Sequence, residues 1–154
     1  MDTPTIHILS KNGHSKGFDS RATQLTRELY ATQLGGELVT KALVRTNKIK
    51  YVVWIQADDG TPIAASMVLQ LRGMYYRVGG LAVHDAHKRK GYGSALLAKI
   101  HELLPSGSRL LLGVDTGKEA TEWLTKWYKR LGFMHVNETH DEILLGKAII
   151  KYDE

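Results

Sequence analysis

The chain has 154 residues, of which 43% are hydrophobic and 24% are charged, as in an ordinary globular protein. We expect a single domain, residues 1–154, with a sizeable core. The absence of cysteine excludes disulfides, thiolate metal sites and cysteine nucleophiles. The net charge of +5 suits an anionic ligand and is equally typical of a solvated surface. Because the first residues hold no long apolar run, we expect no signal peptide or membrane span and a cytoplasmic protein.

The N-terminal third of the chain is predicted to hold one strand and two helices. Thr5 to Leu9 alternates weakly between apolar and polar residues, as a strand does. Ser20 is placed to cap an amphipathic helix. Gly35-Gly36 ends this helix, and a second short helix is expected over residues 37–46.

Three antiparallel strands are expected next, over residues 49–57, 61–71 and 74–83. The first is rich in β-branched and aromatic residues, which favour strands. Between the first two, Asp58-Asp59-Gly60 has the composition of a type I′ hairpin turn. Arg72-Gly73 forms the second turn.

The rest of the chain alternates helices and strands: a helix over 93–104, a strand over 109–114, a helix over about 118–131, and strands over 133–136 and 143–151. The continuous apolar run of 109–114 is typical of a strand buried on both faces. We therefore predict a mixed α/β (α+β) fold, in which helices flank a mostly antiparallel sheet.

A basic, glycine-spaced turn links the strand that ends at Val83 to the next helix. Three cations, Lys88-Arg89-Lys90, precede Gly91 and Gly93. Glycine allows the backbone to approach a ligand closely, and a helix N-terminus attracts phosphate. Alone, this pattern is more often an ordinary strand-to-helix turn with solvated lysines than a phosphate site. It lacks the Gly-Lys-Ser/Thr of a Walker loop and the third glycine of a dinucleotide fingerprint.

Two segments together resemble a known family. Leu81-Ala82-Val83, a gap of four residues, Lys88-x-x-Gly91-x-Gly93 and Leu96-Leu97 resemble the acetyl-CoA-binding motif of the GNAT superfamily of N-acetyltransferases. Trp127 to Phe133 (WYKRLGF) resembles its second signature. With the strand pattern from Ile49 onward, the resemblance covers nearly the whole chain. It implies a GNAT fold with a splayed mixed sheet, and acetyl-CoA-dependent N-acetylation.

The resemblance also implies where the cofactor lies. A bulge at Gly79-Gly80 would separate this strand from strand 109–114, so that the pantetheine arm pairs with the backbone of Leu81 and Val83. Ala82, between them, is also expected to contact the cofactor. The pyrophosphate would lie on the turn made of Lys88, Arg89, Lys90, Gly91, Tyr92, Gly93 and Ser94. Lys88 stands where Arg or Gln is usual in the family. Thr121, another expected cofactor contact, stands where many members carry Asn.

For catalysis, the resemblance implies direct attack by an amine on the thioester. The backbone N–H of Leu81 is the candidate oxyanion donor. Tyr128 is the candidate acid for the thiolate, the alternative being a packed helix aromatic. Near Arg77, where some members carry a Glu, the sequence has no carboxylate.

The identity of the general base is therefore open. Asp115, acting through water, is the first candidate. Tyr75, Tyr76 and His84 are the others.

The sequence leaves the acceptor and some partners open. A small amine, a polyamine or a peptide amine is the leading acceptor class. Acidic groups at Asp58-Asp59, Glu119-Glu122 and Glu138-Asp141-Glu142 attract such cations or are simply solvated. The net charge favours an anionic acceptor such as aminoacyl-tRNA. We expect no metal and no membrane partner, and a homodimer is compatible with the family.

Two other functions compete with N-acetylation. The first is a catalytically idle acyl-CoA-binding regulator, because the strand carboxylate is missing. The second is a nucleic-acid-binding module that uses the basic residues 87–90 and the lysines of 46–50. We expect nucleic acid to be the weaker partner, since few aromatic residues can be argued to stack bases.

Overall fold

The computed structural model describes residues 4–11, 17–30 and 48–151. They form a seven-stranded open sheet in the order β1-β2-β3-β4-β5-β7-β6. The strands are β1 (His7–Ser10), β2 (Ile49–Gln56), β3 (Pro62–Gln70), β4 (Tyr75–Val83), β5 (Arg109–Asp115), β6 (Met134–Glu138) and β7 (Glu142–Ala148). The helices are α1 (Phe18–Tyr30), α3 (Tyr92–Leu103) and α4 (Thr121–Arg130), with a 3₁₀ turn η2 (Asp85–His87).

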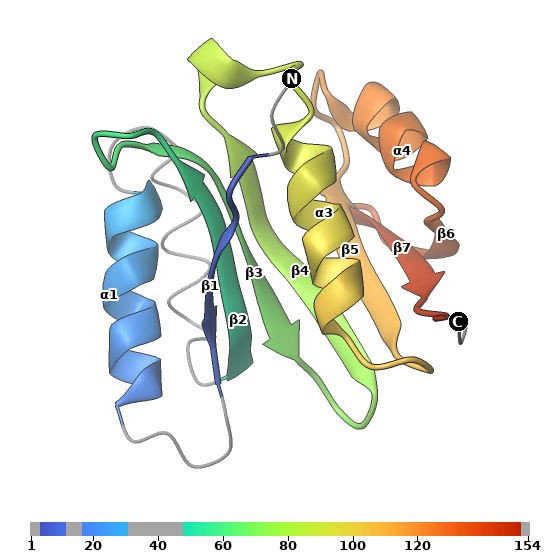
Figure 1. The fold of residues 1–154 in the computed structure, drawn as a ribbon. Helices are drawn as coiled ribbons and strands as arrows, with labels where there is room; N and C mark the ends of the chain where they lie inside the picture. Colours follow the sequence, from blue (N-terminus) through green and yellow to red (C-terminus); the bar gives the residue numbers. More distant parts are fainter. Residues whose placement is uncertain (1–3, 12–16, 31–47, 152–154) are drawn as a thin grey trace.

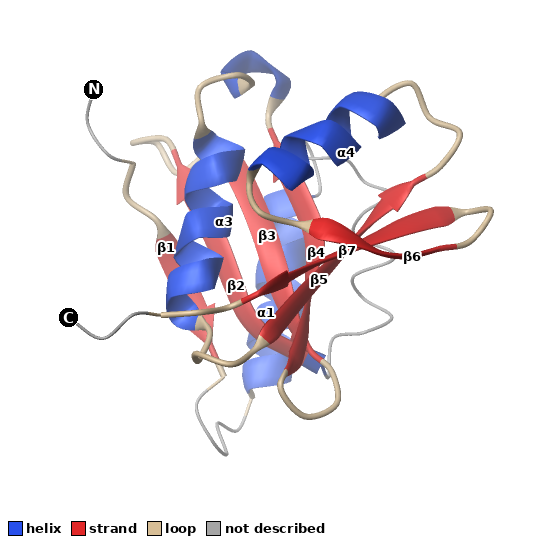
Figure 2. Cartoon of the chain, turned by 90° about the vertical axis from the view of Figure 1, so that its right-hand side faces the viewer, coloured by secondary structure: helices blue, strands red, loops and turns tan. Residues whose placement is uncertain are grey.

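The pairing confirms the predicted mixed α/β fold. The β4–β5 pair is parallel, and the other neighbouring pairs are antiparallel. Helix α1 covers one face of the sheet, and α3 and α4 lie on the other (Figures 1 and 2). The helix expected over residues 37–46 lies outside the described residues. Among the described residues, no helix is both long and apolar enough to cross a membrane.

Two local predictions were wrong. Helix α1 begins at Phe18, which is 1% exposed, so burial of that ring starts the helix before Ser20. The hairpin after β2 is a three-residue loop, in which Gly60 N–H donates to Ala57 O (2.9 Å) and Gly60 alone among its residues has positive φ. A type I′ turn needs two such residues. The Asp59 carboxylate instead accepts from Thr61 N–H, an Asx turn.

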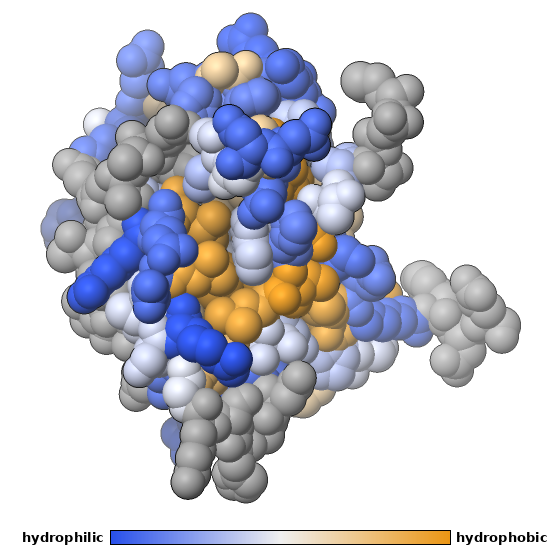
Figure 3. Space-filling model, turned by 60° about the vertical axis from the view of Figure 1, so that its left-hand side comes forward, coloured by the Kyte–Doolittle hydropathy of each residue, from blue (hydrophilic) through white to orange (hydrophobic). Residues whose placement is uncertain are grey.

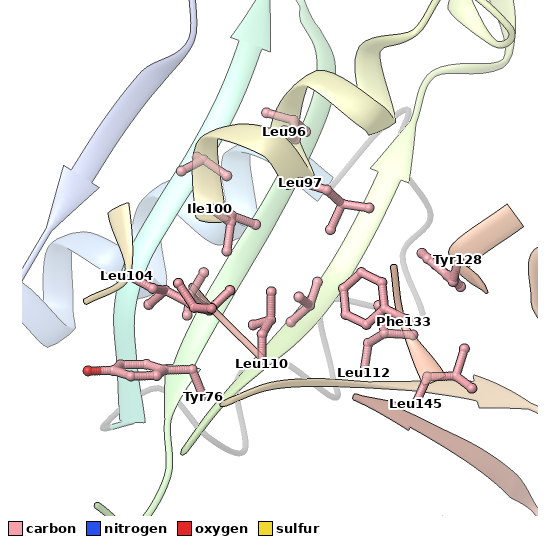
Figure 4. Packing of buried hydrophobic residues seen from close by; sticks show 14 of the residues in the cluster. Tyr76, Leu96, Leu97, Ile100, Leu104, Leu110, Leu112, Tyr128, Phe133 and Leu145 are labelled. Atoms are coloured by element: carbon pink, nitrogen blue, oxygen red, sulfur yellow. The ribbon is translucent and has the colours of Figure 1, made fainter. Parts of the chain in front are cut away.

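Helices on both faces give the sheet two buried clusters. Phe18, Tyr30 and Met67 pack between α1 and the sheet. The larger cluster lies under α3 and α4, and Figure 4 shows its side chains from α3, β5 and α4 converging there. β1 is a short edge strand, where Ile8 is 40% exposed. In the space-filling view of Figure 3, apolar side chains form a patch that is bordered by hydrophilic residues.

The sheet opens between β4 and β5. These strands pair from Tyr75–Arg109 to Arg77–Leu111, after which β4 stays with β3 as far as Val83 and β5 stays with β7. The strands therefore diverge toward the C-terminal ends, as Figure 1 shows. The register of β3 and β4 shifts between Ala65 and Met67, so Gly80 and Leu81 oppose one residue. This confirms the predicted bulge.

Candidate active site

The bulge that bends β4 is held from the face that α1 covers. Gly80 takes a left-handed φ of 61°, and its carbonyl oxygen accepts a hydrogen bond of 2.6 Å from the Tyr30 hydroxyl. The Ser66 hydroxyl donates to the carbonyl oxygen of Gly79 (3.2 Å). Both carbonyl groups of the bulge therefore have donors within the protein, and the bend is fixed before any ligand binds.

Beyond the bulge, the edge of β4 facing β5 is open. His84 N–H donates to Ile63 O at 2.7 Å, which places the backbone groups of His84 and Ala82 on the β3 side. Backbone groups alternate along a strand, so the N–H groups of Leu81 and Val83 point into the gap. They are placed to bond an extended chain that lies along β4.

At the wide end of this gap, the turn after β4 presents backbone donors. Gly91 precedes α3 with a left-handed φ of 83° and gives no side-chain cap. The first helical bond runs from Ala95 N–H to Gly91 O, so the N–H groups of residues 91–94 have no helical partner. Arg89 also has a positive φ, 66°, which is rare for a side-chain-bearing residue. Such strain is typical of a binding turn.

The three cations of this turn differ in surroundings. All are exposed, but the Lys88 ammonium lies 2.9 Å from the Asp85 carboxylate. A hydrogen bond from Lys88 lowers the pKa of Asp85. Part of the charge of Lys88 is therefore already matched, and Arg89 and Lys90 supply most of the attraction for an anion. The rings of His87 and Tyr92 meet edge to face at 6.0 Å and brace the turn.

Helix α4 adjoins the same end of the gap. A Cβ placed at Gly93 would lie 3.2 Å from the Trp127 ring, so the start of α3 touches α4. The next residue, Tyr128, is 9% exposed and packs against Trp127 and Phe133. Burial raises its pKa to about 12. Its hydroxyl is thus protonated at neutral pH and can donate a proton but not accept one.

Residues 49–135 match the family model of the acetyltransferase (GNAT) domain. The chain belongs to the GNAT family. This family membership supports acyl transfer from coenzyme A. No curated protein matches the sequence.

Solved structures share the GNAT fold with this chain at low sequence identity. One is an IAA acetyltransferase from Bacillus cereus, with a TM-score of 0.64, 14% identity and coverage of 94% of this chain and 99% of that one. Another is the ribosomal-protein-S18-alanine N-acetyltransferase from Escherichia coli, with a TM-score of 0.61, 18% identity and coverage of 97% of each chain. A third is an aminoglycoside 6′-N-acetyltransferase that was solved with coenzyme A. Its TM-score is 0.60, its identity is 14%, and the match covers 96% of this chain and 99% of that one.

Thr121 joins α4 to the end of β5 in this GNAT chain. Its hydroxyl donates to Asp115 O (2.6 Å) and accepts from Lys118 N–H (3.1 Å). At the other end of α4, Gly132 N–H donates to Lys129 O and Phe133 N–H to Tyr128 O, which is a Schellman cap with the predicted left-handed Gly132. Both ends of the helix that carries Tyr128 are therefore fixed. The hydroxyl of Thr121, which was expected to contact the cofactor, makes its hydrogen bonds to backbone groups of the protein.

The candidate bases are spread over both faces of the sheet. Asp115 is exposed and alternates with the buried Val114, so its side chain lies on the face opposite α3 and α4. Tyr75 is 50% exposed, whereas Tyr76 is 5% exposed in the core under α3 (Figure 4). His84 Nδ1 accepts from Ala86 N–H, which commits this ring to the turn.

One carboxylate was missed by sequence reasoning. Glu142 was assigned to an acidic group around the β6–β7 turn, but its Oε2 lies 2.8 Å from Arg77 Nη2. The position on β4 without a carboxylate of its own thus receives one from β7, across Gly113 of β5. Only the strand register reveals this contact. Among the described residues, no group of three or more His, Asp or Glu is arranged to hold a metal.

Proposed function

We propose that this protein transfers the acetyl group of acetyl-CoA to a primary amine. The observation that carries this proposal is the gap between β4 and β5, closed at Arg77 and Leu111 and met at its wide end by the N-terminus of α3. An extended, amide-bearing arm would pair with Leu81 and Val83. Its pyrophosphate would lie on the turn from Lys88 to Ser94, where the N–H groups of residues 91–94 have no helical partner.

The transfer needs few groups. The protonated amine first gives up one proton. The neutral nitrogen then bonds to the acetyl carbon, the carbon–sulfur bond breaks, and the nitrogen releases its second proton to solvent. The thiolate gains one proton from an acid, which solvent then reprotonates. Leu81 N–H, at the bulge, would donate to the oxyanion of the tetrahedral intermediate, a contact typically worth about 3 kcal/mol. Tyr128 would protonate the thiolate, and its raised pKa of about 12 keeps its proton in place until the sulfur leaves.

Proton removal from the amine would take place on the other face of the sheet. A lysine-type amine has an ordinary pKa of about 10.4, so it must lose a proton before it can attack. We assign Asp115, acting through water, as the acceptor of that proton. Asp115 and Tyr128 lie on opposite faces of the sheet. Deprotonation of the amine and protonation of the thiolate would therefore take place on opposite sides of the gap.

Two measurements test this function. Calorimetry should show binding of coenzyme A, and incubation of an amine panel with acetyl-CoA should release thiol and add one acetyl mass to an amine. A protein that does not bind coenzyme A would contradict the proposal. A protein that binds it tightly but transfers to no amine would instead be the acyl-CoA-binding regulator.

A further inference from the structure

An ion pair lies at the closed end of the gap. Arg77 is the last β4 residue in register with β5, and its Nη2 lies 2.8 Å from Glu142 Oε2 on β7. The side chains are 24% and 34% exposed. Both groups are thus partly desolvated, which strengthens their electrostatic interactions. They are also still accessible to a solute.

The pair lies on the face of the sheet opposite α3 and α4. The neighbours Val78 and Leu112 are buried in the cluster under α3 and α4, and side chains alternate along a strand. Arg77, Gly113 and Glu142 therefore project from the other face. Since the proposed pantetheine arm runs from the wide end of the gap toward its closed end, its thioester would point toward this pair. An acceptor arriving from this face would meet the pair first.

Gly113 makes the pair possible. A Cβ built at Gly113 would overlap the Glu142 carboxyl group and would lie 2.6 Å from Arg77 Nη2. The two side chains therefore pass directly over the backbone of β5. Replacing Gly113 by alanine changes no charge and must displace one of them.

We propose that Arg77 and Glu142 bind the acceptor, and that this acceptor is a primary amine with a carboxylate close to it, as in an amino acid. This inference rests on the proposed acetyl transfer. A simple cation would have to take Glu142 from Arg77 and leave a partly buried guanidinium without its partner, which is costly. An amino acid replaces one ion pair by two, with its ammonium on Glu142 and its carboxylate on Arg77.

Register places one more acid beside the amine end of this site. Asp115 opposes Glu142 across the antiparallel β5–β7 pair, so the two side chains share a face. The bound ammonium would lie next to the group that we assign to take its proton. Arg77, Asp115 and Glu142 together carry one positive and two negative charges, and this net negative charge favours the ammonium group of the acceptor.

The test compares amino acids with their carboxamides as acceptors. The intact protein should use the acids with kcat/KM at least about tenfold higher. In Arg77→Gln this preference should vanish. In Glu142→Gln, and in Gly113→Ala, KM for amino acids should rise at least about tenfold, because a charge-assisted hydrogen bond is lost, with little change in kcat. Coenzyme A affinity should stay constant in all three, which also shows that the variants fold.

A matched control removes an acid elsewhere. Glu102→Gln breaks the exposed pair with Lys99 on α3 and should leave KM unchanged. Equal use of acids and carboxamides, or an unchanged KM in Glu142→Gln, would overturn the inference while acetyl transfer stands. If no amine is acetylated, calorimetric titration of amino acids into the coenzyme A-loaded protein still decides: binding lost in Glu142→Gln supports the site, and absence of binding to the unaltered protein refutes it.

Discussion

The hydroxyl of Tyr30 on α1 donates a 2.6 Å hydrogen bond to the carbonyl oxygen of Gly80 on β4. Tyr30 is 0% exposed, and burial raises its pKa, so the hydroxyl keeps its proton. The bond ties α1 to the bulge that turns Leu81 into the gap. Helix α1 thus lies on the face opposite α3 and the proposed phosphate-binding turn that precedes it, and yet sets the geometry of the candidate oxyanion donor.

We predict that Tyr30→Phe lowers the free energy of unfolding by about 1–2 kcal/mol, because the partly buried carbonyl group of Gly80 loses its donor. Coenzyme A affinity should fall with it, since the bulge loosens. Urea unfolding and calorimetry measure the two effects. The control is Tyr75→Phe, whose side chain is 50% exposed and should matter little to stability. Equal effects of the two changes would show that the hydrogen bond does not hold the bulge.

The two glycines of the bulge should respond differently to alanine. Gly80 has a φ of 61°, and a Cβ there would lie 3.0 Å from the Tyr30 hydroxyl, whereas at Gly79 the nearest atom is 3.8 Å away. We expect Gly80→Ala to destabilise the protein by about 1–2 kcal/mol from the left-handed backbone alone, and Gly79→Ala to cost less. Thermal unfolding measures both. A larger loss in Gly79→Ala would contradict the assignment of the strain to Gly80.

Gly91→Val should abolish coenzyme A binding and leave the protein folded. Valine disfavours the φ of 83°, although a Cβ at Gly91 meets no atom within 4 Å, so the turn should change shape without disrupting the core. Gly60→Val is the matched control, because Gly60 has a φ of 87° and is equally open but belongs to the β2–β3 hairpin and not to the turn before α3. Calorimetry and unfolding of both variants separate binding from strain. Unchanged affinity in Gly91→Val would remove the turn as the phosphate site.

Tyr128→Phe should lower kcat by about 100-fold or more, as expected for a general acid, with coenzyme A affinity nearly unchanged. With a pKa of about 12, the phenol stays protonated at every lower pH, so ionisation of Tyr128 should cause no loss of activity between pH about 7 and about 10. The ratio of wild-type to variant kcat should therefore be constant over that range. Wild-type turnover in the variant would leave Tyr128 only its packing role.

Local patterns in the sequence were sufficient for much of the fold. Period-two and helical spacing predicted the described strands and helices to within a few residues. Paired glycines predicted the bulge, and Gly132 predicted the cap of α4. These features depend on residues close together in the chain, so a single sequence carries them. The start of α1 was wrong, because burial of Phe18 is a tertiary effect.

The order of the residues by itself determined the elements, the glycine-rich turn and the family motifs. Only the tertiary structure decided which side chains meet. Tyr30 and Gly80 are 50 residues apart, and Arg77 and Glu142 are 65 apart. Such contacts follow from strand register and from the face that each side chain takes, and both are fixed by packing of the whole sheet rather than by any local pattern.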